Sequence, residues 1–377
     1  LRGNYQLSRL GYSAQYYLYG YLPNYIPAPT EEAPDQNLEF DVVTRNIDKL
    51  LTVMTPAVRG FNNARLNGVL NTTAQQLTLH ADIPYGRIED IRISDIRLSG
   101  AGDYRRLDMS GEAGRLVIGD TLLNISIDAN ATLGNDSLAF HVVTSSPNTY
   151  GQAAINGEAY ASGDSLYLKF HPSEFYLSQH RWEIPGGNRI VLSRRYLDIT
   201  NLSFRSGLQH IAVATADTGQ ALDISLKNID LSQLATVGPF SGFDPDGRLQ
   251  GQVNVSDIFD DIVIKGELRA HEVRLGADTI GDIVAIGRYN VSRNFALLQA
   301  PSGVFRGNAS LLASGAFGVD STSNSRMRGQ LQFNNTPLSW LSPVLKDYVS
   351  GLGGVLNGNV QLRGPVSAPD VTGQVAL

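Results

Sequence analysis

Residues 121–130 read Thr-Leu-Leu-Asn-Ile-Ser-Ile-Asp-Ala-Asn, and this stretch decides the fold class. Leu123, Ile125, Ile127 and Ala129 share one parity, and the residues between them are polar. Successive side chains of a β-strand point to opposite faces of its sheet. The pattern therefore predicts a strand with one apolar face and one polar face.

The same alternation recurs along the chain. It is found at Leu166, Leu168 and Phe170, at Ile211 and Val213, and at Leu222, Ile224 and Leu226. Turn-forming residues such as Gly134-Asn135-Asp136 and Ser162-Gly163-Asp164 separate these stretches. We expect an all-β protein with about twenty short strands.

Composition narrows the possible functions. The net charge is -6, so no basic field exists to attract a nucleic acid. Cysteine is absent, which excludes disulfides, thiolate catalysis and cysteine-ligated metals. No apolar run reaches the roughly 18 residues that a transmembrane helix needs.

A pattern occurs three times at unequal spacing. Residues 46–49 lead to 64–68, residues 228–231 lead to 247–251, and residues 335–338 lead to 354–358. Each copy starts with Asn and ends in a Leu-x-Gly strand, and Asn with a following Asp or Thr can cap a helix N-terminus. We expect a strand end, a short helical insertion and a new strand in each copy. The new strands carry, on one parity, Leu66 and Leu70; Leu249, Val253 and Val255; and Leu356, Val360 and Leu362.

These copies suggest four segments. Residues 1–40 are predicted to hold a Tyr-rich strand region, from Tyr5 to Tyr25, and a Pro-rich acidic linker. Residues 41–227 form a first sheet segment that begins with a helical insertion, and residues 228–334 form a second. Residues 335–377 form a third helix-plus-strand repeat. Both ends read as unfinished strands, so we expect an excerpt of a longer protein.

No group of residues predicts catalysis or metal binding. The six His are scattered without the spacing of metal ligands. Residues 244–247 read as a turn, and Asp257, Asp260 and Asp261 read as a solvated loop. We expect no enzyme activity, no metal and no cofactor.

Two regions resemble the TamB and AsmA-like family. Residues 338–343, 356–364 and 369–375 resemble its recurrent segment of a short helix, a Leu-x-Gly strand and a Gly-x-x-x-x-Pro-x-x-x-Gly pattern, with Gly364, Pro369 and Gly373 in the last part. The order of motifs in residues 182–211 is also similar to the family's pattern.

The resemblance implies an elongated, curled, U-shaped β-groove of the bridge-like lipid transfer kind. It implies a periplasmic location in a protein anchored to the inner membrane, with the anchor outside this chain. It also implies an outer-membrane barrel partner of the TamA type, reached through regions outside this chain.

Together, these features predict that an apolar groove shelters phospholipid acyl chains between the two membranes. The predicted groove residues are Leu66, Leu70, Leu123, Ile125, Ile127, Leu166, Leu168, Phe170, Ile211, Val213, Leu222, Ile224, Leu226, Leu249, Val253, Val255, Leu356, Val360 and Leu362. The alternative is a scaffold whose sheet edges assist the assembly of outer-membrane β-barrel proteins. A polysaccharide-cleaving enzyme is a third, weaker hypothesis.

Overall fold

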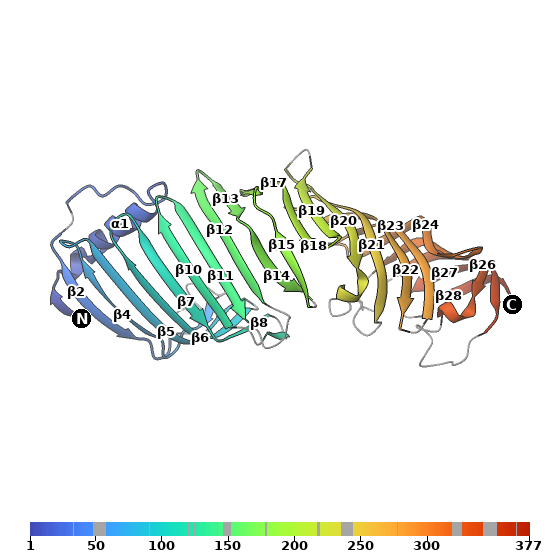
Figure 1. Ribbon diagram of the computed structural model, residues 1–377, viewed down its shortest axis with the longest axis horizontal. Coiled ribbons are helices and arrows are strands. Elements are labelled where there is room, and N and C mark those ends of the chain that lie inside the picture. The colour runs from blue at the N-terminus through green and yellow to red at the C-terminus, as the bar shows by residue number, and fades with distance from the viewer. Residues whose placement is uncertain are drawn as a thin grey trace. The chain divides into compact units, whose positions relative to one another are not determined.

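The computed structural model describes most of the chain as two compact units of β-sheet. Residues 1–32, 34–47, 58–89, 91–118, 121–123, 126–145, 152–177, 179–216, 219–234, 244–276, 278–318, 326–341, 353–366 and 368–377 are described. Unit 1 is Leu1–Arg194 and unit 2 is Arg195–Leu377. In each unit the described strands form a curled antiparallel sheet that does not close on itself (Figure 1), which confirms the predicted fold class. The segment boundaries predicted at residues 40, 227 and 334 stay predictions.

Unit 1 contains one α-helix and sixteen strands among its described residues. Its elements are β1 (Arg2–Asn4), η1 (Leu7–Arg9), α1 (Leu10–Tyr21), β2 (Asn37–Val43), β3 (Val58–Gly60), β4 (Arg65–Asn71), β5 (Gln76–Ile88), β6 (Ile91–Gly102), β7 (Leu107–Ala113), β8 (Arg115–Ile118), β9 (Thr121–Leu123), β10 (Ser126–Gly134), β11 (Ser137–Ser145), β12 (Ala153–Ser162), β13 (Ser165–Phe170), β14 (Ser173–Leu177), β15 (His180–Ile184) and β16 (Arg189–Leu192). The main ladder runs β1, β2, β4, β5, β6, β7, β10, β11, β12, β13, β16. Strands β3 and β8 pair with the far ends of β5 and β6.

The described residues of unit 2 form a meander and two short 3-10 helices. Its elements are β17 (Leu197–Thr200), β18 (Leu202–Ser206), β19 (Gln209–Thr215), β20 (Leu222–Asp230), η2 (Leu231–Leu234), β21 (Pro245–Ser256), β22 (Val263–Leu275), β23 (Asp278–Asn290), β24 (Phe295–Arg306), β25 (Ala309–Gly318), β26 (Arg326–Pro337), η4 (Leu338–Leu341), β27 (Val355–Pro365) and β28 (Asp370–Ala376). From β18 to β28 each strand pairs with the next one in the sequence.

The prediction of a strand for the tyrosine-rich region is wrong, because most of this region is helix α1. Ser13, Tyr17 and Tyr21 are its buried residues, and their spacing of four places them on one helix face. Tyr is common in strands because it packs well on half-buried sheets, and packing can override that preference. Here two tyrosines pack onto the sheet from a helix.

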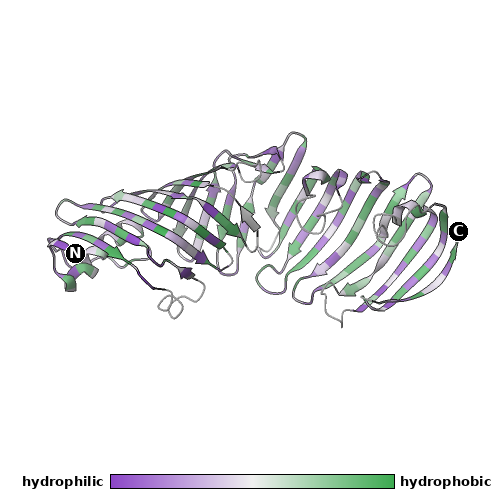
Figure 2. Cartoon of the chain, turned by 90° about the horizontal axis from the view of Figure 1, so that it is seen from below, coloured by the Kyte–Doolittle hydropathy of each residue, from purple (hydrophilic) through white to green (hydrophobic). Residues whose placement is uncertain are grey.

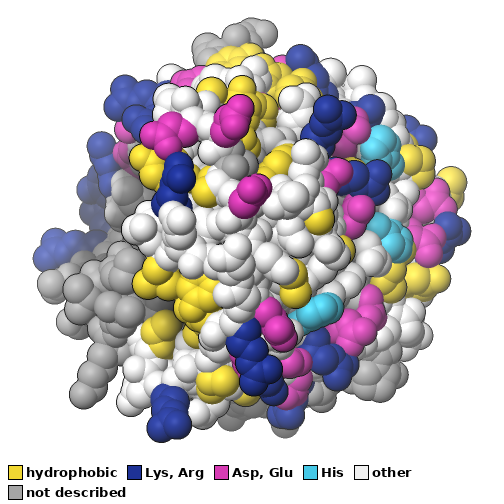
Figure 3. Space-filling view, turned by 90° about the vertical axis from the view of Figure 1, so that its left-hand side faces the viewer, with side chains coloured by type: hydrophobic (Ala, Val, Ile, Leu, Met, Phe, Trp, Pro, Cys, Tyr) yellow, Lys and Arg dark blue, Asp and Glu magenta, His cyan; other side chains and the backbone are white. Residues whose placement is uncertain are grey.

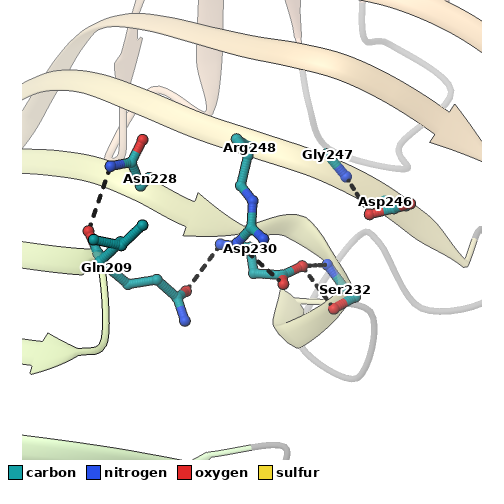
Figure 4. A network of polar contacts seen from close by, with 8 residues as sticks. Gln209, Asn228, Asp230, Ser232, Asp246, Gly247 and Arg248 are labelled. Carbon is teal, nitrogen blue, oxygen red and sulfur yellow. Dashed lines mark hydrogen bonds and ion pairs between the residues drawn. The ribbon is translucent and has the colours of Figure 1, made fainter.

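The described part of the second predicted helical insertion contains the 3-10 turn η2, and that of the third contains the 3-10 turn η4. Most of the first insertion, and Pro56, Pro239 and Pro343, lie outside the described residues. In the second copy, Asp230 Oδ1 accepts a hydrogen bond from the Ser232 backbone N–H at 3.0 Å, so the residue that caps this turn is Asp230 and not the predicted Asn228 (Figure 4). Gln209 Oε1 accepts from the Asp230 N–H at 2.9 Å and Arg248 donates to Asp230 at 3.3 Å, so neighbouring strands hold this turn.

The glycine in the Leu-x-Gly strands allows two backbones to approach each other. Gly251 has φ +150, and a Cβ there would lie 2.1 Å from the backbone oxygen of Glu267 on β22. Gly266 on the partner strand has no such constraint, since the nearest atom to its Cβ would be 3.9 Å away.

We expect Gly251→Ala to lower the free energy of unfolding by about 2 kcal/mol, because alanine strains both the backbone and the contact with β22. Gly266→Ala is the matched control and should change it by less than about 1 kcal/mol. Urea denaturation followed by circular dichroism measures both. Equal stability of the two variants would contradict the close approach at Gly251.

Candidate functional site

One face of the unit 1 sheet is apolar across its full width. Directly opposed residues of antiparallel strands point to the same face. One cross-strand row reads Val42, Leu66, Ala81, Leu98, Gly111, Ala129, Val142, Ile155. The next row reads Phe40, Gly68, Leu79, Gly100, Met109, Ala131, Phe140, Gly157, Phe170. A third reads Leu38, Leu70, Leu77, Gly102, Leu107, Leu133, Leu138, Ala159, Leu168, Ile190. We call these three rows the unit-1 apolar face.

The opposite face of the same strands is polar. Cross-strand ion pairs join Arg65 to Asp41 at 2.6 Å and Lys169 to Glu158 at 3.1 Å, and Arg97 pairs with Glu112. Figure 2 shows the resulting stripes of hydrophobic and hydrophilic residues along the strands. The view of the N-terminal end in Figure 3 shows acidic, basic and His side chains interspersed over its right-hand side. Exposed pairs of this kind add little stability, so their main consequence is a well-solvated outer surface.

Helix α1 covers one end of the unit-1 apolar face. Tyr17 and Tyr21 are buried against Leu77 and Leu107. The Tyr17 hydroxyl donates to the backbone oxygen of Gln76 at 2.9 Å, and that of Tyr21 donates to the backbone oxygen of Asp103 at 2.7 Å. Both partners lie at hairpin ends, so α1 crosses the turns at one rim of the sheet.

The middle of the unit-1 apolar face has no protein layer over it within the described ranges. Leu66 and Leu98 are 42% and 45% exposed although their side chains belong to this face. A hollow of about 320 Å³ lies here, in the size range of ligand pockets. Its lining residues are Leu66, Leu79, Ala81, Leu98, Ser99, Gly100, Met109, Ser110, Gly111, Ala129 and Ala131.

Unit 2 repeats this arrangement. One row reads Val213, Ile224, Val253, Gly266, Gly287, Leu298, Gly315, Gly329, Leu362, Val371. Another reads Leu249, Ala270, Ile283, Val304, Leu311, Phe333, Gly358, Val375. Shorter rows read Ile211, Leu226, Gly251, Leu268, Ala285 and Leu222, Val255, Ile264, Tyr289, Ala296. We call these rows the unit-2 apolar face.

The two 3-10 turns cover one end of the unit-2 apolar face. Leu231 of η2 and Trp340 of η4 form a buried cluster with Ala270, Val273 and Ile280. The Arg306 guanidinium lies 5.5 Å from the centre of the Trp340 ring, within the range of a cation–π contact. Each unit therefore has one rim of its apolar face packed under helical residues.

The structure brings most of the predicted groove residues onto these two faces. Leu66, Leu70, Ile127, Leu166, Leu168 and Phe170 lie on the apolar parity of unit 1. Ile211, Val213, Leu222, Ile224, Leu226, Leu249, Val253, Val255, Leu356, Val360 and Leu362 lie on that of unit 2. Ile125 and the side chain of Leu123 lie outside the described residues. Contact of any of these predicted groove residues with a lipid stays a prediction.

Sequence reasoning missed several residues that build the hollow. Leu79, Leu98 and Met109 lie in its wall, on β5, β6 and β7. The signal for Leu79 and Met109 was present, because residues 77–83 and 107–113 alternate in the same way. Glycines at positions such as Gly100 and Gly102 interrupt the apolar parity and weaken that signal.

In the part of the chain that the structure describes, His, Cys, Asp and Glu form no group that could hold a metal ion. None of the helices described is long and apolar enough to span a membrane. His80 and His141 contact polar neighbours, Ser99 and Asn156, on the polar face.

His210 on β19 predicts a pH dependence of stability. Its Nε2 atom is buried without a hydrogen-bond partner among the described residues. Burial lowers the pKa of His210, and the opposed Arg205 and Lys227 lower it further. The unfolded state, with a His pKa of about 6.5, then binds a proton that the folded state does not. The free energy of unfolding is therefore highest above about pH 6.5 and decreases as the pH falls below that value.

We expect His210→Gln to remove this decrease. Urea midpoints of both proteins at about pH 7.5 and about pH 5.5 measure it, a window above the carboxylate titrations. The same loss of stability in the variant and the parent protein would contradict the role of His210.

Comparisons with known proteins point to one family. No curated protein and no solved structure matches the chain significantly. Residues 209–377 match the family model described as TamB, N-terminal domain. The matched region starts at the first residue of β19 and includes η2, η4 and every strand up to β28. Residues 209–377, which make up somewhat less than half of the chain, are therefore similar to the TamB N-terminal domain.

Proposed function

We propose that the two apolar faces shelter the acyl chains of phospholipids during transfer between membranes. The observation that carries this proposal is the exposure of Leu66 and Leu98 on a face whose opposite side holds the ion pairs. An uncovered apolar face of this width is unusual for a soluble protein unless it binds an apolar partner.

The energetics favour an acyl chain as that partner. Each methylene that leaves water contributes about 0.8 kcal/mol, so an acyl chain of about sixteen carbons would cost on the order of 12 kcal/mol in water. An apolar face removes most of this cost along the path, and it needs no reactive residue. Gly100 and Gly111, which line the hollow in unit 1, place no side chain in it.

The location and the partners in this proposal rest on the similarity of residues 209–377 to the TamB N-terminal domain. The chain would lie in the periplasm as part of a protein anchored in the inner membrane. Its partner would be an outer-membrane barrel protein of the TamA type, contacted through regions that are not in this chain. The lipids would move passively along the face.

Two measurements test the proposal. Mass spectrometry of the purified chain should find bound phospholipid, and the chain should speed the exchange of fluorescent phospholipid between vesicles. Protein that binds no lipid and speeds no exchange would contradict the proposal. If such protein still crosslinked to unfolded outer-membrane barrel proteins through sheet edges, the scaffold function would be favoured instead.

A further inference from the structure

Glycines interrupt the rows of the unit-1 apolar face, and close contacts explain two of them at once. A Cβ on Gly68 would lie 2.0 Å from the backbone oxygen of Thr78, and one on Gly102 would lie 2.3 Å from that of Arg106. A larger residue fits at neither position unless the backbone of the next strand moves. These two glycines therefore serve the packing of the strands themselves.

Gly100 on β6 is different, because neither space nor backbone conformation requires a glycine there. The atom nearest to an added Cβ would be Leu107 Cδ1 at 3.5 Å, an ordinary contact distance. The φ angle of Gly100 lies outside the left-handed region that favours glycine, and the register is regular on both sides of it.

A glycine inside a strand lowers stability relative to alanine, so its presence needs a cause. The usual causes are a bulge, a tight bend, or the close approach of another backbone or of a ligand. The regular register excludes a bulge, and the space around Gly100 excludes a neighbouring backbone. The approach of a ligand remains.

Gly100 lies in the floor of the hollow on the unit-1 apolar face. The register opposes it to Leu79 on β5 and to Met109 on β7, and all three residues line the hollow. Ser99 and Ser110 line it as well, although they are opposed to each other on the polar face. Backbone atoms of β6 and β7 therefore form part of the floor.

We propose that Gly100 lets an acyl chain lie directly against the backbone of β6, and that the hollow is the point of deepest lipid contact on the unit-1 apolar face. Residues of β4, β5, β6, β7 and β10 line the hollow, so a chain in it is contacted from several strands. Dispersion contacts are small singly and add up over such a surface. This inference rests on the proposed function, since it requires acyl chains on this face.

Filling the hollow tests the proposal. The variants Gly100→Ala, Gly100→Val and Gly100→Leu place side chains of increasing volume on its floor. Each methylene of the lipid that loses its burial lowers affinity about fourfold, so a leucine that displaces about two methylenes lowers it about fifteenfold. Calorimetry with a dioctanoyl phospholipid measures the affinities of the full chain and its variants.

Stability should change in the opposite direction. The urea midpoint of the lipid-free Gly100 variants should stay the same or rise, because the strand loses a glycine and the hollow is filled. A residue with only a structural role would lose stability together with binding. The separation of the two readouts is therefore the signature of a glycine that makes room for a ligand.

Two further variants complete the experiment. Ala129→Leu fills the hollow from β10 and should also weaken binding, without any change at Gly100. Ala101→Leu is the matched control, because Ala101 is opposed to Thr78 and Asp108 on the polar face and does not line the hollow. It should bind the lipid as the parent chain does.

The outcomes separate this inference from the proposed function. Unchanged affinity in both Gly100→Leu and Ala129→Leu would overturn the inference and leave the proposed function intact. A lower urea midpoint throughout the Gly100 series, Gly100→Ala included, would show that the backbone needs this glycine and would also overturn the inference. A parent chain that binds no phospholipid would defeat the proposed function itself.

Discussion

Replacing Leu98 with aspartate is expected to abolish phospholipid binding on the unit-1 apolar face and to leave the fold intact. Leu98 is 45% exposed, so the new carboxylate reaches water in the lipid-free protein, and a surface change of this kind shifts stability by about 0.5 kcal/mol or less. An acyl chain over the hollow would cover that carboxylate. Burying an unpaired charge costs several kcal/mol, so affinity should fall by about a hundredfold or more.

Asn130 on β10 provides the matched control. It is opposed to Ser110 and His141 on the polar face and does not line the hollow, although Ala129 and Ala131 beside it do. Asn130→Asp adds the same charge and should bind lipid as the parent chain does. Calorimetry with a dioctanoyl phospholipid measures both variants. Normal binding by Leu98→Asp would show that acyl chains do not lie at the hollow.

Replacing Tyr17 with alanine is expected to have the largest effect on the stability of unit 1. Tyr17 is 2% exposed and packs edge-on against Tyr104 at 4.6 Å between ring centres. Truncating a buried aromatic side chain to alanine costs about 3–5 kcal/mol. The backbone oxygens of Asn71 and Gln76 also lose the hydroxyl that donates to them.

Tyr17→Phe separates the two contributions. It keeps the ring and removes only the hydroxyl, so it should cost about 1–2 kcal/mol. Urea denaturation gives the free energies, and hydrogen exchange at residues 71–76 reports whether α1 has left the rim. An alanine variant as stable as the parent chain would mean that Tyr17 does not hold α1 against the end of the unit-1 apolar face.

The strands of this protein are predictable from its sequence because successive side chains of a strand point to opposite faces of the sheet. Ile127, Leu168 and Ile224 were assigned to an apolar face by alternation alone, and register places each of them there. Helix α1 was not predicted, since its tyrosines also suit a strand. Only the contacts of Tyr17 and Tyr21 with the sheet distinguish the two cases.

Register is the part that the sequence does not reveal. Leu79, Gly100 and Met109 come from three strands, and only the pairing of β5, β6 and β7 brings them together in the hollow. The same limit applies to exposure. Alternation shows that Leu66 and Leu98 have one apolar side, but it cannot show that no layer covers them. An open face and a sandwich core have the same pattern.

Site-specific photo-crosslinking tests the open apolar face most directly. A photoreactive benzophenone amino acid at position 98 lies on the apolar face, and one at position 130 lies on the polar face. The account predicts that illumination in cells attaches phospholipid at position 98 and none at position 130, as read by mass spectrometry of the purified chain. Attachment of a protein segment at position 98, with no lipid, would contradict it.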